Sequence, residues 1–144
     1  MQCGEIMRQH VAALPLEATA ADAARLMAEH GCGILPICGA DGGVAGVITD
    51  RDIVIRVCAE GRSPSDTRVS EIMSRELVAC SPSDPLHAAE ELMVKHKKAR
   101  IIVLDAGRLA GVISLTDIAQ HEEPLRLARL LREISSREYR LEHS

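Results

Sequence analysis

Aromatic side chains are almost missing from this 144-residue chain, which has no Phe, no Trp and a single Tyr at position 139. Surfaces that bind single-stranded nucleic acid stack the bases on aromatic rings, so the composition argues against that function. The formal net charge of −4 also provides no basic field that would attract a polyanion. We therefore expect no nucleic-acid partner, and a core filled by Leu, Ile, Val, Ala and Met.

Long apolar runs and targeting signals are missing as well. The longest aliphatic stretch of consequence, residues 101–104, is far shorter than a membrane span. Residues 1–5 lack the charged start and apolar stretch of a signal peptide. The five cysteines include no Cys-x-x-Cys pair, and their odd number without an export signal indicates reduced thiols. We expect a cytoplasmic protein without a membrane partner, and no metal site, because no His, Cys and Asp cluster has ligand spacing.

What the chain does contain is a tandem repeat. Residues 5–7, Glu-Ile-Met, return at residues 71–73, and the segment 46–53 returns with small changes at 111–118. Such a repeat is considered before any other pattern, because a segment that recurs at a fixed spacing sets the architecture of the chain. Each unit of about 60 residues would be marginally stable alone. We therefore expect the two units to share a core and to form a pseudo-twofold pair with matched clefts.

Each repeat has the same order of predicted elements. A short strand precedes a helix with apolar residues at helical spacing, then two strands joined by a turn, then a second helix. The predicted ranges are 11–14, 20–30, 34–38 and 44–49 in the first repeat, and 77–80, 85–97, 100–104 and 109–114 in the second.

Two details of the first repeat give sharper expectations. Pro36 lies inside a predicted strand, which favours an edge or irregular position because proline cannot donate to the ladder. In the second helix, one predicted face is apolar and consists of Ile53, Val54, Val57 and Cys58.

The segment 122–142 lies outside the repeat and has the pattern of an amphipathic helix. Its five arginines are balanced by five glutamates, which favours docking on its own domain or on a dimer mate over a basic membrane-surface helix. The predicted apolar stripe, interrupted only at Glu138, consists of Leu127, Leu130, Leu131, Ile134 and Leu141.

The motif with possible chemistry is Thr49-x-x-Asp52, repeated as Ser114-x-x-Asp117, where a strand gives way to a helix. One interpretation is a capping box that satisfies the first backbone N–H groups of each helix. The other is a ligand site. A hydroxyl at a helix start can donate to a phosphate, and an aspartate one turn on can accept from the two hydroxyls of a ribose.

The whole pattern resembles a tandem pair of cystathionine-β-synthase (CBS) domains, a Bateman module, over about residues 3–120. The resemblance implies an α/β (α+β) fold of two β-α-β-β-α units packed with pseudo-twofold symmetry, plus an extra C-terminal helix. The predicted boundaries are unit 3–62, linker 63–68, unit 69–121 and helix 122–144. The family also implies clefts between the units that bind adenosine-containing ligands.

The resemblance assigns roles to individual positions. Asp52 and Asp117 match ribose-binding acids, and Thr49 and Ser114 match the hydroxyl near the ribose phosphate. Arg100 resembles a phosphate-contacting arginine of nucleotide-sensing members, and Arg51 is a further phosphate candidate that alternatively is a solvated helix residue. The remaining cleft positions are those of the strand that walls the adenine, Ile34 and Pro36, and the early-strand residues Ala13 and Ala79. Two departures from the family pattern distinguish the repeats: Ile102 stands where the family usually has Pro, and Ile34 stands where the second repeat has Arg100. If only one cleft binds tightly, these differences are the expected reason.

The leading functional hypothesis is a stand-alone regulatory module that binds an adenine nucleotide, AMP, ADP or ATP, and signals to a separate, unidentified protein. A sensor of NAD or S-adenosylmethionine is an alternative, as is a dimeric interaction scaffold whose repeated motifs are helix caps only. An enzyme has only generic Asp, His and Cys residues in its favour, so we expect no catalytic residue and no catalytic cofactor. A homodimer is expected, because the C-terminal apolar stripe needs cover.

Overall fold

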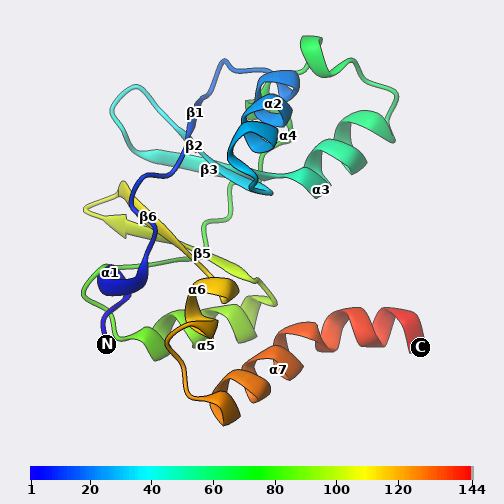
Figure 1. Cartoon of the computed structure of the whole chain (residues 1–144). Coiled ribbons are helices and arrows are strands. Elements are labelled where there is room, and N and C mark those ends of the chain that lie inside the picture. Colours follow the sequence, from blue (N-terminus) through cyan, green and yellow to red (C-terminus); the bar gives the residue numbers. More distant parts are fainter. Residues whose placement is uncertain (144) are drawn as a thin grey trace. The chain divides into compact units, whose positions relative to one another are not determined.

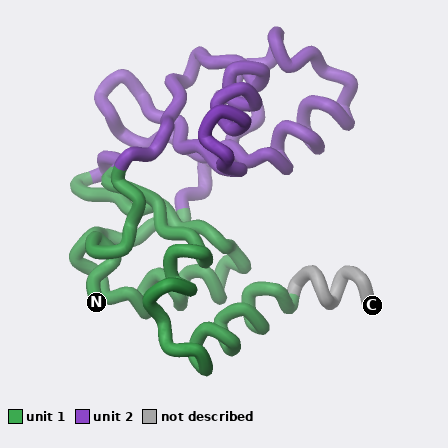
Figure 2. Tube along the Cα trace, in the orientation of Figure 1, with its two compact units in different colours: residues 1–9, 78–106, 110–144 green, residues 10–77, 107–109 purple. Residues whose placement is uncertain are grey.

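The computed structural model describes the backbone of residues 1–143 and the side chains of residues 1–136. The chain forms two compact units (Figure 2): unit 1 comprises residues 1–9, 78–106 and 110–144, and unit 2 comprises residues 10–77 and 107–109. Each unit contains one three-stranded sheet with helices (Figure 1), which confirms the predicted mixed α/β class and the additional C-terminal helix. The boundaries predicted for the sequence repeats stay a prediction.

Unit 2 holds most of the first repeat. Its sheet has the order β1-β2-β3, with β1 parallel and β3 antiparallel to the central β2. Its elements are β1 (Leu14–Pro15), α2 (Ala20–His30), β2 (Ile34–Cys38), β3 (Val44–Thr49), α3 (Asp50–Ile53), a π-helical turn (Val54–Cys58), a 3-10 turn (Pro64–Asp66) and α4 (Val69–Ile72).

Unit 1 holds most of the second repeat and has the equivalent sheet, in the order β4-β5-β6. Its elements are α1 (Cys3–Ile6), β4 (Ala79–Cys80), α5 (Leu86–His96), β5 (Arg100–Asp105), β6 (Arg108–Ser114), α6 (Leu115–Ala119) and α7 (Pro124–His143). Within the described residues, no helix is both long enough and apolar enough to cross a membrane.

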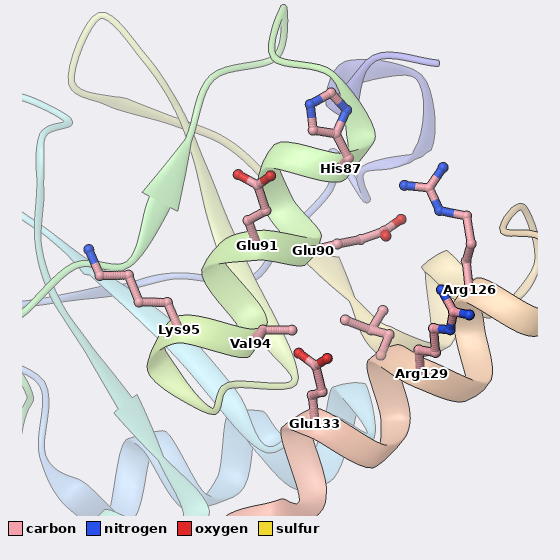
Figure 3. A pocket seen from close by; sticks show the side chains of 9 residues that line it. His87, Glu90, Glu91, Val94, Lys95, Arg126, Arg129 and Glu133 are labelled. Atoms are coloured by element: carbon pink, nitrogen blue, oxygen red, sulfur yellow. The ribbon is translucent and has the colours of Figure 1, made fainter.

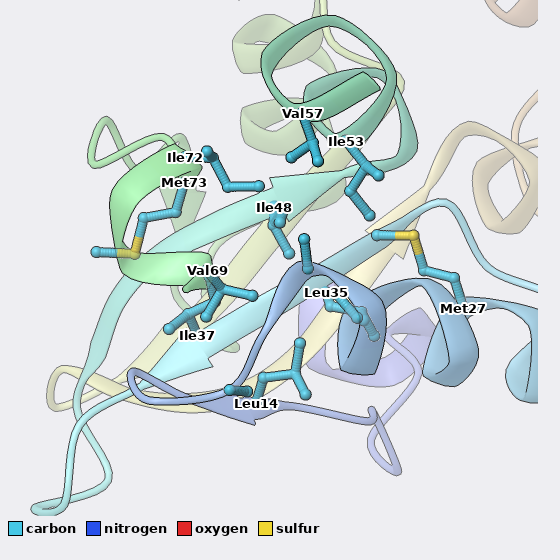
Figure 4. Packing of buried hydrophobic residues seen from close by; sticks show 13 residues of the cluster. Leu14, Met27, Leu35, Ile37, Ile48, Ile53, Val57, Val69, Ile72 and Met73 are labelled. Carbon is cyan, nitrogen blue, oxygen red and sulfur yellow. The ribbon is translucent and has the colours of Figure 1, made fainter. Parts of the chain in front are cut away.

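The buried side chains form two clusters, so the expectation of one shared core is wrong. In unit 2, Val69 and Ile72 of α4 pack into the cluster around Leu35, Ile37 and Ile48 of the sheet (Figure 4). In unit 1, the equivalent short helix α1 contributes Cys3 and Ile6 to the cluster of β5 and β6. Each Glu-Ile-Met segment therefore completes the core made by the strands of the other repeat. Each core thus contains a short helix from the other repeat, and the two cores stay separate.

A close backbone crossing accompanies each exchanged helix. Val47 of β3 forms two backbone hydrogen bonds with Ser74, of 3.0 and 2.9 Å, and Val112 of β6 forms the same pair with Arg8, of 2.9 and 3.1 Å. A Cβ atom at Gly46 would lie 2.6 Å from the Ser74 carbonyl oxygen, and one at Gly111 would lie 2.6 Å from that of Arg8. Only glycine allows the backbones to approach this closely.

The structure corrects two expectations for the first repeat. Pro36 lies in the central strand rather than at an edge, although the strand is irregular nearby, with a register shift between Ile37 and Cys38. β1 pairs only at Ile37 and Cys38, so it does not require the missing N–H of Pro36. Val54 and Cys58 are exposed instead of sharing the buried face of Ile53 and Val57. The π-type hydrogen bond from Ala59 N–H to the Val54 carbonyl rotates this turn relative to an α-helix.

The first strands and the C-terminal stripe are also only partly as predicted. β1 and β4 are two residues long and begin later than the ranges 11–14 and 77–80 indicated. On α7, Leu130 is buried and Leu127 and Ile134 are partly buried, whereas Leu131 is 46% exposed. Glu138 and Leu141 lie outside the residues whose side chains are described.

Substitution of either crossing glycine by alanine is expected to lower the free energy of unfolding by about 1–3 kcal/mol, because the new methyl group overlaps a backbone oxygen. Urea unfolding of Gly46→Ala and Gly111→Ala measures this. Gly31→Asn is the control, since Gly31 has a φ of 61° and open space around its Cβ position, and Asn tolerates that conformation. Wild-type stability in both alanine variants would contradict the crossing as a packing constraint.

Candidate functional site

The first-repeat motif forms the corner between β3 and α3. Thr49 Oγ1 accepts a hydrogen bond of 3.1 Å from the Asp52 N–H, and Asp52 Oδ2 accepts one of 2.9 Å from the Thr49 N–H. This reciprocal pair is a capping box. The second carboxylate oxygen, Oδ1, lies 3.8 Å from Nε of Arg56. The Asp52 side chain is only 16% exposed, so the corner holds a mostly buried carboxylate with one oxygen outside its own box.

The second-repeat motif forms the same corner between β6 and α6. Ser114 and Asp117 exchange hydrogen bonds of 3.1 and 2.9 Å, again as a capping box. Here Oδ1 of Asp117 accepts a hydrogen bond of 3.1 Å from Nε of Arg8, and the carboxylate is 12% exposed. The capping interpretation is therefore confirmed at both corners. It uses one oxygen of each carboxylate and leaves the other for a cation or a further donor.

The two corners differ in their cations. Arg8 is placed beside Asp117 by its backbone pairing with β6, and the equivalent position in unit 2 is Ser74, which carries no charge. The unit 2 corner instead uses Arg56, one helical turn along, at the longer distance of 3.8 Å. His121, the counterpart of Arg56 in unit 1, lies with Nδ1 3.1 Å from the Asp117 carbonyl oxygen. The differences between the repeats that were noted in the sequence, at Ile34, Arg100 and Ile102, gave no sign of this contrast between Arg8 and Ser74.

Arg100 and Ser114 meet at a cavity of about 370 Å³ in unit 1. Arg100 is exposed at the start of β5, and the backbone of its neighbour Ala99 accepts a 2.8 Å hydrogen bond from the Leu115 N–H, which keeps β5 beside the corner. Polar and apolar side chains share the lining, which consists of Ala99, Arg100, Ser114, Leu115, Thr116, Ala119, Leu127 and Leu131.

Six members of this lining were not among the residues predicted for the site, namely Ala99, Leu115, Thr116, Ala119, Leu127 and Leu131. Thr116 adds a hydroxyl to those of the motif, but a residue between two motif positions carries no signal of its own. Leu127 and Leu131 come from α7, which follows the repeat and has no counterpart in it. Periodicity indicated that α7 is amphipathic, but gave no sign that it lines a cavity.

The first-repeat candidates are spread around the unit 2 corner. Ile34 pairs with Thr49 across the β2–β3 ladder, so these two lie side by side. Pro36 is fully buried, Ala13 is exposed just before β1, and Arg51 is exposed on α3. The structure thus brings Ile34 to the corner and places the ring of Pro36 in the core.

In unit 1, Ala79 is half-buried and pairs with Ile102 in the parallel β4–β5 register. The side chain of Ile102 is only 3% exposed, so it offers almost no surface to solvent at this part of the sheet. Ala79 does not line the cavity of Arg100 and Ser114.

A second cavity, of about 410 Å³, lies between α5 and α7 in unit 1 (Figure 3). Its central feature is Glu90, which is 8% exposed and whose Oε1 has no hydrogen-bond partner. Burial raises the pKa of Glu90 to about 7, and a hydrogen bond with Glu122 and the charge of that residue add to the shift, while Arg126 opposes it. The same hydrogen bond and the Glu123 N–H lower the pKa of Glu122. Nothing in the sequence pattern indicated this carboxyl pair.

Within the part of the chain that the structure describes, no three His, Cys, Asp or Glu side chains gather closely enough to hold a metal ion. All five cysteines lie in that part, and each is a free thiol.

A family model of the CBS domain matches this chain twice, at residues 3–58 and at residues 69–123. The chain belongs to the CBS domain family. The matches cover both repeats and leave α7 outside, which confirms the resemblance seen in the repeated motifs.

Individual relatives agree with this assignment. The CBS domain-containing protein YhcV of Bacillus subtilis is 37% identical over 118 residues, which are 82% of this chain and 83% of YhcV. Hypoxic response protein 1 of Mycobacterium tuberculosis is 33% identical over 81% of this chain and 82% of its own. The crystal structure of Hypoxic Response Protein I with two coordinated zinc ions has a TM-score of 0.79, 32% identity, and covers 85% of this chain and all of its own.

A more distant structure shares the fold. The CBS domain pair of protein MJ0100, solved in complex with 5-methylthioadenosine and S-adenosyl-L-methionine, has a TM-score of 0.75 and 22% identity. It covers 83% of this chain and 94% of its own.

The stability of unit 1 is expected to fall between about pH 5 and pH 8, because buried Glu90 must ionise. Its pKa in the folded chain, about 7, lies above the usual 4.5, so the folded state binds more protons in this interval. Linkage then makes the free energy of unfolding decrease as pH rises, until Glu90 is ionised in both states. We expect a loss of about 1–2 kcal/mol after the opposite shift of Glu122 is allowed for.

Urea unfolding at several pH values measures this slope. Glu90→Gln, which mimics the neutral carboxyl, should remove most of it, whereas Glu91→Gln at the exposed neighbouring position should keep it. An equal slope in wild type and Glu90→Gln would show that another group titrates.

Proposed function

We propose that this CBS pair is a regulatory module that binds an adenine nucleotide, AMP, ADP or ATP, and passes its ligand state to a separate protein. The observation that carries the proposal is the cavity in unit 1 where Arg100 and two hydroxyls meet aliphatic side chains. Its volume, about 370 Å³, lies in the range of small-molecule pockets. A ligand with an anionic group and an apolar ring matches this lining.

The phosphate end of such a ligand would contact Arg100. A guanidinium forms charge-assisted, often bidentate, hydrogen bonds with phosphate. Ser114 Oγ already accepts from the Asp117 N–H, which leaves its hydroxyl proton free to donate to a phosphate oxygen. The exposed Thr116 hydroxyl lines the same cavity and can add a further donor.

The ribose would be held by Asp117. Its Oδ2 is used by the capping box, and its Oδ1 has lone pairs beyond the one used by Arg8. Arg8 is 69% exposed and, among the described side chains, pairs with Asp117 alone, so it can turn toward a phosphate at little cost. At the other corner Asp52 would act in the same way, with Thr49 and Arg51 near the phosphate.

The adenine would lie against aliphatic side chains, because the described cores contain no aromatic ring. In the unit 1 site, the aliphatic wall is made by Leu127 and Leu131, and Ala79 stays a candidate outside this lining. In the unit 2 corner, Ile34 and Ala13 are the candidates, and Pro36 would contribute through its strand rather than its buried ring. S-adenosylmethionine or NAD are alternative ligands with the same adenosine part. The ligands of the MJ0100 CBS pair, which are 5-methylthioadenosine and S-adenosyl-L-methionine, support the adenosine class.

The proposal also includes the oligomeric state and the compartment of the module. Val54 and Ile55 in unit 2 are 56% and 47% exposed, and two neighbouring exposed apolar side chains support a homodimer. The five free thiols fit a reducing compartment such as the cytoplasm. We assign the module a regulatory role rather than a catalytic one.

A dimeric scaffold without ligand is the second candidate. The completeness of both capping boxes, together with the arginines at both second oxygens, favours it. In that case the corners serve stability alone.

Removal of the Arg100 charge is expected to weaken nucleotide binding. Loss of a charge-assisted hydrogen bond costs about 1.5–3 kcal/mol, which corresponds to roughly a tenfold to hundredfold rise in Kd. Isothermal titration of Arg100→Gln with AMP and ATP measures this, and Lys98→Gln, at another exposed cation nearby in sequence, should bind like wild type. No heat for wild type with AMP, ATP, NAD or S-adenosylmethionine would remove the proposal.

The scaffold and the sensor are separated by Asp117→Asn. The amide oxygen can still cap α6, so stability should change by less than about 1 kcal/mol, while the amide cannot replace a carboxylate that accepts from ribose. We expect ligand affinity to fall more than stability does. Asp22→Asn is the matched control, because Thr19 and Asp22 form the same box with the same distances, 3.1 and 2.9 Å, at the start of α2. Equal effects of the two variants on binding would favour the scaffold.

A further inference from the structure

Helix α7 forms a wall of the cavity that holds Arg100 and Ser114. Leu127 and Leu131 line this cavity, whereas Leu130, between them in sequence, is 5% exposed and belongs to the unit 1 core. One side of α7 therefore touches the domain, and an adjoining side faces the cavity. Figure 1 shows α7 beside α5 and α6 in the same unit.

The contacts that hold α7 are few. Among its described side chains only Leu130 is buried, and Leu127 and Ile134 are half-buried. Burial of one leucine stabilises by about 1.5–3 kcal/mol. Lys97 Nζ donates a 2.8 Å hydrogen bond to the Glu133 carbonyl, but this bond is exposed and adds little. By comparison, α5 buries Leu86, Ala89 and Met93.

Helices with few buried contacts open at low free-energy cost, so a modest differential contact can shift the docked population. Leu131 supplies such a contact. It is 46% exposed, and the surface it leaves open faces the cavity lined by Arg100, Ser114 and Thr116. A ligand whose phosphate binds Arg100 would lay its apolar part against Leu127 and Leu131. These contacts exist only while α7 is docked.

We propose that α7 is the output element of the unit 1 site: a nucleotide in the cavity holds α7 docked, and its loss releases the helix for a partner to detect. This inference rests on the proposed function, and names how that site is coupled to the rest of the chain. By linkage, the factor by which the ligand favours docked α7 equals the factor by which docking strengthens ligand binding.

Hydrogen exchange of residues 124–136, read with and without saturating AMP, ATP or S-adenosylmethionine, tests the coupling. We expect the bound ligand to slow exchange in this segment by about fivefold or more, within the usual range of coupling between sites. Leu131→Ala should lower both the affinity and the protection. Leu125→Ala is the matched control, because Leu125 is 59% exposed on the same helix and does not line the cavity.

A second variant changes the docking of α7 instead of the cavity lining. Leu130→Ala removes the core anchor of α7, so exchange in 124–136 should rise and the affinity should fall although Leu130 does not line the cavity. Exchange in α5 reports whether the rest of unit 1 stays folded.

The outcomes separate the two proposals. If a probe binds in isothermal titration but exchange in 124–136 does not change, and Leu131→Ala binds like Leu125→Ala, the coupling is wrong while the sensing function stands. If no probe binds, the sensing function fails, and the role of α7 fails with it.

Discussion

The structure depends on the close crossing of two backbones at Gly46 and at Gly111. At each crossing, the segment that follows a short helix pairs with the last strand of a sheet, and no side chain fits between them. The crossing holds α4 on the unit 2 sheet and α1 on the unit 1 sheet. A unit of this size buries little surface by itself, so the additional apolar residues of the exchanged helices, such as Ile72 and Ile6, are a substantial part of each core.

The same crossing sets the electrostatics of the corners. Because Arg8 pairs with Val112 in the backbone, its side chain lies next to Asp117, which is five residues further along the chain. The corresponding pairing in unit 2 uses Ser74, so Asp52 has no such partner. Two motifs that are nearly identical in sequence thus form corners with different charge. The residue that each crossing brings to the corner, Arg8 or Ser74, makes the halves unequal, rather than a difference in the motifs.

Unit 1 differs further because the described part of α7 packs in its core. The docked face of α7 closes one side of the cavity with Arg100 and Ser114. Another part of α7 lines the second cavity, which holds the buried carboxyl of Glu90 next to Glu122. A buried carboxyl without a full set of partners costs free energy. The Glu90 carboxyl therefore weakens the packing between α5 and α7, as the proposed release of α7 requires.

The repeat, the strands 34–38 and 44–49 and the helix 20–30 could be predicted from the amino acids alone, because they depend on local periodicity. Both capping boxes could be proposed in the same way, since each joins residues three apart. Tertiary structure alone decided the central place of Pro36, the exposure of Val54, the exchange of α1 and α4, and the meeting of Leu131 with Arg100. Each of these joins residues distant in sequence or depends on a non-standard helical turn. No local pattern encodes such contacts, since they arise only when one element finds the apolar face or strand edge that another leaves open.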